Sequence, residues 1–160
     1  MKTCLIGLML IARLSIAGTS GAAQAPSRTD TSAVELAAAA YAKARLPLNE
    51  PLTLEPRART ADTWSTVRSA QQTAALASVL GAVVSTFIEC ELPPSLRVCP
   101  VRPAGVGIVL GQVKFAAGEA EIVVEMHYHS GIGTETYVVV RGRQGWQVSR
   151  VSRVSATSQL

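Results

Sequence analysis

The last third of the chain constrains the fold most, because strand-like segments follow one another there with only short glycine-bearing turns between them. The clearest segment, 120–129, alternates apolar and polar residues as a half-buried strand does. Turns this short join neighbouring antiparallel strands. The sequence therefore predicts an antiparallel meander, with strands at 105–115, 120–129, 134–141 and 146–154.

The first half of the chain predicts two helices ahead of this meander. Ser32 and Glu35 form a capping-box pattern at the start of an alanine-rich segment. Leu46 precedes Pro47, and proline disfavours helix in the residue before it, so the first helix is expected to end there. The predicted buried stripe of this helix is Val34, Ala38, Tyr41 and Ala42.

The second helix is expected over about 64–80. Asp62 or Thr63 can cap its start, and Gly81 is a suitable stop. Its apolar positions fall roughly on one side, as an amphipathic helix requires. These positions are Val67, Ala70, Ala74, Leu76, Ala77 and Leu80.

Two further segments are predicted to be extended. Three prolines surround 52–54, which is expected to be a short edge strand because edges tolerate proline. Apolar pairs in 83–89 could continue the second helix, but its β-branched residues favour a strand. The expected fold class is α+β, with two N-terminal helices packed on an antiparallel sheet of four to five strands.

Parts of the meander resemble nuclear-transport-factor-2-like domains, which have the cystatin-like α+β fold. Residues 118–125 are similar to a strand entry of that family, in which glycine, an acid and alanine precede alternating valines. Residues 137–141 and 145–148 resemble its closing hairpin, where a glycine turn seats a tryptophan. The resemblance implies a curved sheet forming a cone around a pocket. Some relatives use this cone for isomerase, dehydratase or cyclase chemistry, and others only bind or assemble.

The N-terminal segment has the layout of a secretory signal peptide. Lys2 precedes the apolar run 4–12, and 23–25 places small residues where a signal peptidase reads. The alternative is an uncleaved anchor, but the run is shorter than the ~20 residues of a spanning helix. We expect a periplasmic or extracellular protein whose mature form does not span a membrane. Its expected parts are a signal peptide (1–25), a flexible lead (26–31), one domain (32–155) and a tail (156–160).

Two cysteines, Cys90 and Cys99, remain after removal of the signal segment. An even number of cysteines in an exported chain favours a disulfide. The alternative is a metal pair, but cysteines at this spacing without a nearby histidine match no zinc pattern. The bridge is expected to pin the proline-containing loop between them.

Glu125, His127 and His129 form the sharpest candidate site. Alternate residues of a strand share a face, and imidazole and carboxylate groups are good ligands for zinc or a similar ion. The same histidines could act as acid and base if this face lined the cone. The alternative is that these residues form the solvated polar face of a strand whose other face is apolar.

Other chemistries find little support in the sequence. No serine lies in a nucleophile elbow, and no glycine loop precedes a helix as phosphate binding requires, so no cofactor is expected. The nearest approach to a basic nucleic-acid-binding cluster is Arg141, Arg143, Arg150 and Arg153, which we interpret as solvated strand ends. No nucleic-acid partner is therefore expected.

The sequence thus favours a non-enzymatic exported domain that binds a small apolar ligand or a protein partner. The second hypothesis is a cone-pocket enzyme that uses His127 or His129 with Glu125. A third is a homodimer formed through the exposed sheet face, which would hide Val123 and its neighbours.

Overall fold

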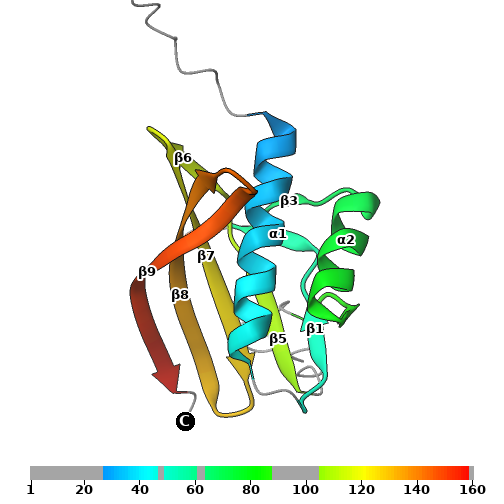
Figure 1. The fold of residues 1–160 in the computed structure, drawn as a ribbon. Coiled ribbons are helices and arrows are strands. Elements are labelled where there is room, and N and C mark those ends of the chain that lie inside the picture. Colours follow the sequence, from blue (N-terminus) through cyan, green and yellow to red (C-terminus); the bar gives the residue numbers. More distant parts are fainter. Residues whose placement is uncertain (1–26, 47–48, 61–63, 88–104, 159–160) are drawn as a thin grey trace, which may run out of the picture.

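The computed structural model describes residues 27–46, 49–60, 64–87 and 105–158, without the side chains of 64–66 and 158. These residues form two helices and a large curved sheet, with a small two-stranded sheet beside them (Figure 1). The helices are α1 (Arg28–Arg45) and α2 (Ala70–Leu80). The strands are β1 (Leu52–Leu54), β2 (Arg57–Arg59), β3 (Trp64–Val67), β4 (Ala82–Val84), β5 (Val106–Leu110), β6 (Lys114–Ala116), β7 (Glu119–Tyr128), β8 (Gly131–Gly142) and β9 (Gly145–Ser158).

The main sheet has seven strands among the described residues, in the order β4-β1-β5-β7-β8-β9, with β6 paired to β7. Strands β5, β7, β8 and β9 are antiparallel neighbours, which confirms the predicted meander. Strand β1 runs parallel to both β4 and β5. The fold class α+β is confirmed, but the sheet has more strands than the four to five expected and is mixed. The second helix lies between β3 and β4, so the helices are not both N-terminal to the sheet.

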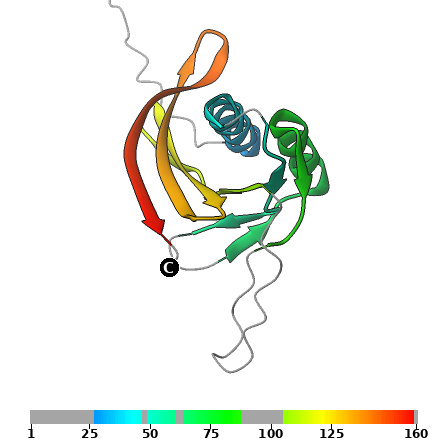
Figure 2. The ribbon, with the colours of Figure 1, turned by 90° about the horizontal axis from the view of Figure 1, so that it is seen from below.

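The sheet curves around α1, which lies against its concave face (Figure 2). Ile122, Val124 and Tyr137 on this face are fully or almost fully buried and pack in one cluster with Val34 and Ala38 of α1. The predicted apolar faces of β7 and of the first helix are therefore confirmed. Alternation of side chains along β7 then turns Val123, Glu125 and His127 toward the opposite, convex face.

Helix α1 begins one turn before the predicted start. Ser27 is its N-cap: its hydroxyl accepts from the Asp30 backbone N–H at 3.1 Å, and Asp30 accepts in return from the Ser27 N–H at 3.2 Å. The capping box predicted at Ser32 and Glu35 is wrong, because both side chains point to α2 and its entry instead. The predicted end at Leu46 is confirmed.

The predicted helix over 64–80 is a strand followed by a shorter helix. Ser69 caps α2 by accepting from the Gln72 N–H at 3.2 Å, and the expected caps at 62 and 63 lie outside the described residues. Val67, expected on the buried side of the helix, ends β3 with 72% of its surface exposed. Gly81 stops α2 with a left-handed φ of 66°, as predicted.

Three strand predictions near the start of the sheet need correction. Strand β1 is flanked on both sides and is not an edge strand. The edge beside it is β4, so the strand predicted over 83–89 is confirmed only as far as Val84, and residues 85–87 lie outside it. The predicted strand 105–115 is interrupted after Leu110. Its next residue, Gly111, donates to the Val123 carbonyl at 2.7 Å, and a Cβ there would lie only 3.3 Å from the Arg59 carbonyl oxygen. The chain thus bends where a glycine allows two backbones to approach closely.

The last hairpins are longer than the sequence indicated. Strand β8 begins at Gly131 directly after a two-residue turn that contains His129, so this histidine is not on β7 as predicted. Strand β9 continues past its expected end near 154 to Ser158.

Several sequence predictions fall outside the described residues, namely the segment 1–25 and the pair Cys90 and Cys99. Within the described ranges, no helix is long and apolar enough to cross a membrane.

Candidate functional site

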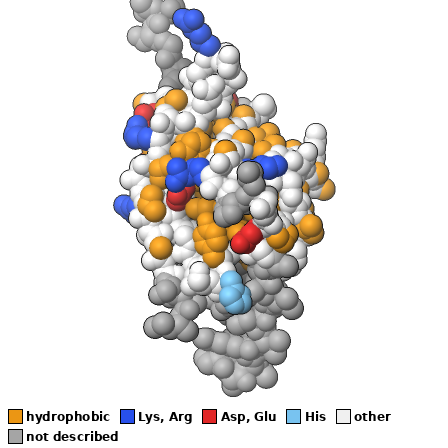
Figure 3. Space-filling view, turned by 60° about the horizontal axis from the view of Figure 1, so that its bottom comes forward, with side chains coloured by type: hydrophobic (Ala, Val, Ile, Leu, Met, Phe, Trp, Pro, Cys, Tyr) orange, Lys and Arg blue, Asp and Glu red, His pale blue; other side chains and the backbone are white. Residues whose placement is uncertain are grey.

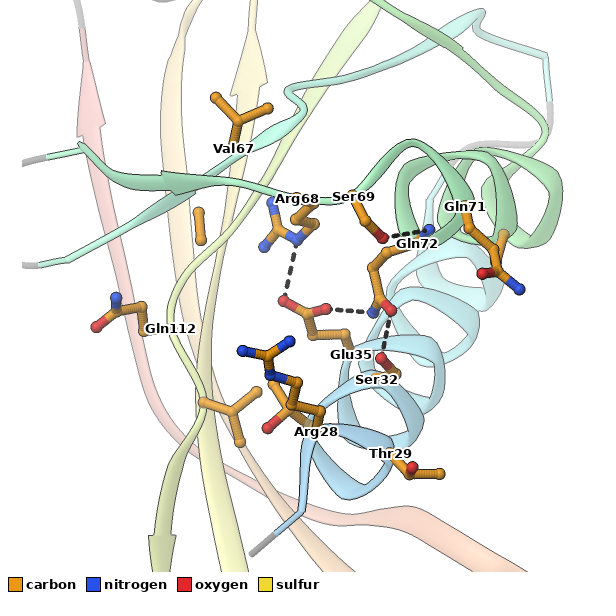
Figure 4. Close-up of a pocket in the computed structure, with 14 residues that line it drawn as sticks. Arg28, Thr29, Ser32, Glu35, Val67, Arg68, Ser69, Gln71, Gln72 and Gln112 are labelled. Carbon is orange, nitrogen blue, oxygen red and sulfur yellow. Dashed lines mark hydrogen bonds and ion pairs between the residues drawn. The ribbon is translucent and has the colours of Figure 1, made fainter.

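A hollow in the described surface lies where the N-terminal half of α1 meets the start of α2; we call it the α1–α2 pocket (Figure 4). Its volume is about 860 Å³. Helix α1, the entry to α2 and the β5–β6 connection each contribute wall residues. This volume falls within the range of about 300–1,000 Å³ that small-ligand pockets occupy.

A buried ion pair forms part of the pocket wall. Arg68 Nε lies 3.0 Å from Glu35 Oε1, and the two side chains are only 4% and 7% exposed. Arg68 also donates to the Leu110 carbonyl at 2.9 Å. A buried pair offsets its desolvation only when its remaining hydrogen-bonding positions are also filled. Here the Leu110 carbonyl and the Gln72 side chain of α2 fill those positions, so the pair is fixed in place.

Polar contacts extend this pair across to α2. Gln72 Nε2 donates to Glu35 Oε2 at 2.5 Å, and the Ser32 hydroxyl donates to the side-chain oxygen Oε1 of Gln72. Figure 4 shows the resulting chain of contacts from Arg68 through Glu35 and Gln72 to Ser32. Both oxygens of the Glu35 carboxylate are therefore occupied by protein donors. Glu35 is therefore better suited to form part of the wall of a binding pocket than to transfer a proton.

The rest of the lining is mostly uncharged. Arg28, exposed at the start of α1, is the one further charged residue among the described lining residues. The polar lining groups beyond the network are Thr29, Thr31, Ser69, Gln71 and Gln112. The apolar lining groups are Ala58, Val67, Ala75 and Val113. The sequence predicted an apolar ligand, and this lining sets hydroxyl and amide groups beside a larger apolar surface.

Two of the three predicted site residues do meet, on the convex face of the sheet. His127 Nε2 lies 3.1 Å from Glu125 Oε2, and Arg59 reaches the same oxygen at 2.7 Å. The rings of Phe87 and His127 pack in a T-shaped arrangement, with the centroids 5.6 Å apart. We call Arg59, Glu125 and His127 the convex-face cluster. It borders a smaller cavity of about 320 Å³ that Glu125 and Arg59 line together with Val109 and Val123.

Electrostatics keep Glu125 ionised. Burial alone would raise the pKa of its carboxyl, but the hydrogen bond to His127 and the charge of Arg59 outweigh burial and lower it. A carboxylate with a lowered pKa is a poor proton donor at neutral pH. In this cluster Glu125 acts as a fixed negative charge that orients His127.

His129 does not join the other two residues. It lies exposed in the β7–β8 turn, beyond the end of the strand that carries Glu125 and His127. Among the described residues, no group of three histidine, cysteine, aspartate or glutamate side chains is placed to hold a metal ion. The spacing of two residues was sufficient to place Glu125 and His127 on one face of the sheet, but strand β7 ends before His129.

A third charged cluster sits under the C-terminal end of α1. The Tyr137 hydroxyl donates to Glu135 at 2.8 Å, and Arg45 lies 3.0 Å from the same carboxylate. Burial, reinforced by the neighbouring Glu135, raises the pKa of Tyr137 far above its usual value. Tyr41 packs edge-on against Tyr137, with the centroids 5.0 Å apart. These contacts join α1 to β8 and leave the phenol protonated, so we assign the cluster a structural role.

Sequence reasoning missed the α1–α2 pocket, because Glu35 was assigned to a helix cap and Arg68 to a helix interior. A signal was available in the sequence. Glu35 is the single charged residue in 31–42 and stands next to Val34 of the predicted buried stripe. Arg68 is likewise the single charge within the second predicted helix. Isolated opposite charges beside buried stripes are candidates for pairing with each other.

Comparisons of the chain with protein-family models, with curated proteins and with solved structures found no match.

Proposed function

We propose that this protein is an exported, non-enzymatic domain that binds a small ligand in the α1–α2 pocket. The observation that carries the proposal is a cavity of about 860 Å³ whose buried charges, Glu35 and Arg68, are already paired. Among the described lining residues, the groups left for a ligand are amides, hydroxyls and one cation, Arg28. The expected ligand is a small molecule with an apolar body and a few polar groups, which is neutral or carries one negative charge. Export is supported by the signal-like layout of 1–25.

The proposal is tested by titrating the protein with small neutral sugars, short amides and monocarboxylates while recording backbone amide NMR shifts. A matched pair of variants controls for location. Ala75→Phe places a ring in the pocket wall, whereas Ala74→Phe adds the same ring at an exposed position of α2 that does not line the pocket. We expect saturable shifts around Gln72 and Gln112 in the native protein and in Ala74→Phe, and their loss in Ala75→Phe. Equal binding by both variants would place the ligand elsewhere.

The second candidate function is an acid–base enzyme or a metal-binding protein that uses Glu125, His127 and His129. What favours it is the 3.1 Å contact between His127 and Glu125 beside a cavity. In this mechanism His127 would transfer the proton and Glu125 would orient its ring. The two residues lie on the convex face, away from α1, which weakens the cone-pocket form of this hypothesis.

Metal analysis separates the second candidate from the first. Near-stoichiometric zinc in the purified protein that disappears in a His127→Ala/His129→Ala double variant would favour the metal-binding function. Zinc-free protein that keeps its ligand response in the α1–α2 pocket would favour the binding domain.

A further inference from the structure

Both acids in the N-terminal half of α1 already have a cationic partner. Glu35 and Arg68 neutralise each other in the pocket wall, and Arg68 directs its remaining donors at backbone carbonyls. Asp30 is not among the described lining residues. Its carboxylate contacts the β8–β9 hairpin instead, with Arg141 3.6 Å away. Neither acid therefore presents a free negative charge to a ligand in the α1–α2 pocket.

Arg28 is a lining cation without such a partner. It is exposed in the first turn of α1, and among the described residues it forms no ion pair or hydrogen bond. Figure 4 shows its side chain extending away from the helix, into the space between Glu35 and Gln112. Because the charges of Glu35 and Arg68 cancel, Arg28 leaves the described lining with a net positive charge.

The other end of the pocket is apolar. Val67 has 72% of its surface exposed, the largest exposed fraction among the large hydrophobic side chains of the described residues. It lines the pocket together with three further apolar side chains. Figure 4 shows Val67 and Arg28 at opposite ends of the pocket, with the Glu35–Arg68 pair between them. A cavity with an apolar end and a cationic end matches a ligand that has an apolar part and an anionic group.

We propose that the ligand of the α1–α2 pocket is a carboxylic acid with an apolar tail, and that Arg28 selects its charge. This inference rests on the proposed function, because it names the ligand class of the same pocket. The planar guanidinium of Arg28 pairs with the carboxylate, and the tail covers Val67. Glu35 does not repel the carboxylate, because Arg68 cancels its charge and both of its oxygens already accept hydrogen bonds.

The charge of the lining also limits the kind of anion. One unpaired cation suits a ligand with a single negative charge. A phosphate monoester carries about −1.5 to −2 charges at neutral pH and would require further cations. Among the described lining residues, the remaining polar groups are uncharged amides and hydroxyls, which do not supply them.

A charge preference at this pocket can be separated from a general attraction of anions to the protein. On the lower face of the molecule, the described lysine and arginine side chains are scattered among hydrophobic and uncharged ones (Figure 3). Arg143, in the β8–β9 turn, is exposed like Arg28 but is not among the described lining residues. Replacing Arg143 changes the net charge of the protein by the same amount, so it is the matched control.

The test compares octanoate with octanamide, which share an apolar tail and differ in charge. In amide NMR titrations of the native protein, the Kd for octanoate should be about fivefold lower, as for an ion pair with an exposed partner. Arg28→Gln should remove this preference by weakening octanoate alone, whereas Arg28→Lys and Arg143→Gln should keep it. Val67→Ser should weaken both probes and keep the ratio of their Kd values. Added salt should weaken octanoate only.

A preference for octanoate that is lost in Arg28→Gln alone, with shifts around Gln72 and Gln112, supports the proposal. Equal Kd values, no binding of octanoate, or a preference that survives Arg28→Gln would overturn it. If neutral sugars or short amides still shift Gln72 and Gln112, the proposed binding function stands and only the ligand class is wrong. If no probe shifts these residues, both are wrong. The dispersion of each amide spectrum shows whether that variant is folded.

Discussion

The α1–α2 pocket and the convex-face cluster each contain an arginine paired with a glutamate at a short distance, 3.0 Å in one and 2.7 Å in the other. They differ in their surroundings. Glu35 and Arg68 are almost completely buried, whereas the Arg59 side chain is 36% exposed beside Glu125. Similar distances therefore correspond to different energetics, because water screens the second pair and is excluded from the first. The Glu35–Arg68 pair therefore fixes the fold, whereas the Arg59–Glu125 pair can respond to the solvent around it.

The largest effect is expected from breaking the buried pair. Glu35→Ala leaves the Arg68 guanidinium buried without its counter-charge, which typically costs about 3–5 kcal/mol. Urea unfolding followed by circular dichroism measures this loss. A Glu35→Leu/Arg68→Met double variant, which removes both charges, is the control and should recover much of the lost stability. A loss as small as that of a surface pair would show that water reaches this site.

A smaller effect is expected in the convex-face cluster. Arg59→Ala removes a partly exposed partner of Glu125 and should lower the free energy of unfolding by about 0.2–1 kcal/mol. Because exposed pairs are screened, the difference between Arg59→Ala and the native protein should shrink at high salt. Unfolding curves at low and high salt test this. A difference that does not depend on salt would mean that Arg59 acts through packing.

The smallest effect is a pH dependence at Glu125. The pKa of this carboxyl is lowered in the folded protein, so its ionised form stabilises the fold above the unfolded pKa. That contribution is lost as the pH falls below the usual glutamate range and through the folded pKa. Glu125→Gln should therefore make stability less sensitive to acid in this window. Glu121→Gln, at an exposed position of the same strand face, is the matched control and should keep the native acid sensitivity.

The local sequence pattern was sufficient to predict the meander and to place Glu125 near His127. Alternation along β7 predicted which residues face α1 and placed Glu125 and His127 on the same side. It could not predict that the strand ends before His129, because the position of a tight turn depends on pairing with β8. The pattern also gave no sign that β1 would lie between two parallel strands, since those neighbours are distant in sequence.

The start of α1 shows most clearly what local reasoning leaves out. Ser32 and Glu35 have the spacing of a capping box, and so do Ser27 and Asp30 one turn earlier. A cap stabilises a helix by only about 1 kcal/mol, whereas a buried glutamate without its partner costs several times more. The approach of Arg68 therefore decides which pair becomes the cap. Only the packing of α2 against α1 brings that arginine near.

The sequence by itself determined the strand alternation, the glycine stop of α2 and the extended backbone around the prolines, because each depends on neighbouring residues alone. The tertiary structure decided the sheet order, the α1–α2 pocket and the ionised state of Glu125. Each of these depends on which distant segments meet and on how much water remains between them. The cost of burying a charge exists only once the chain has folded.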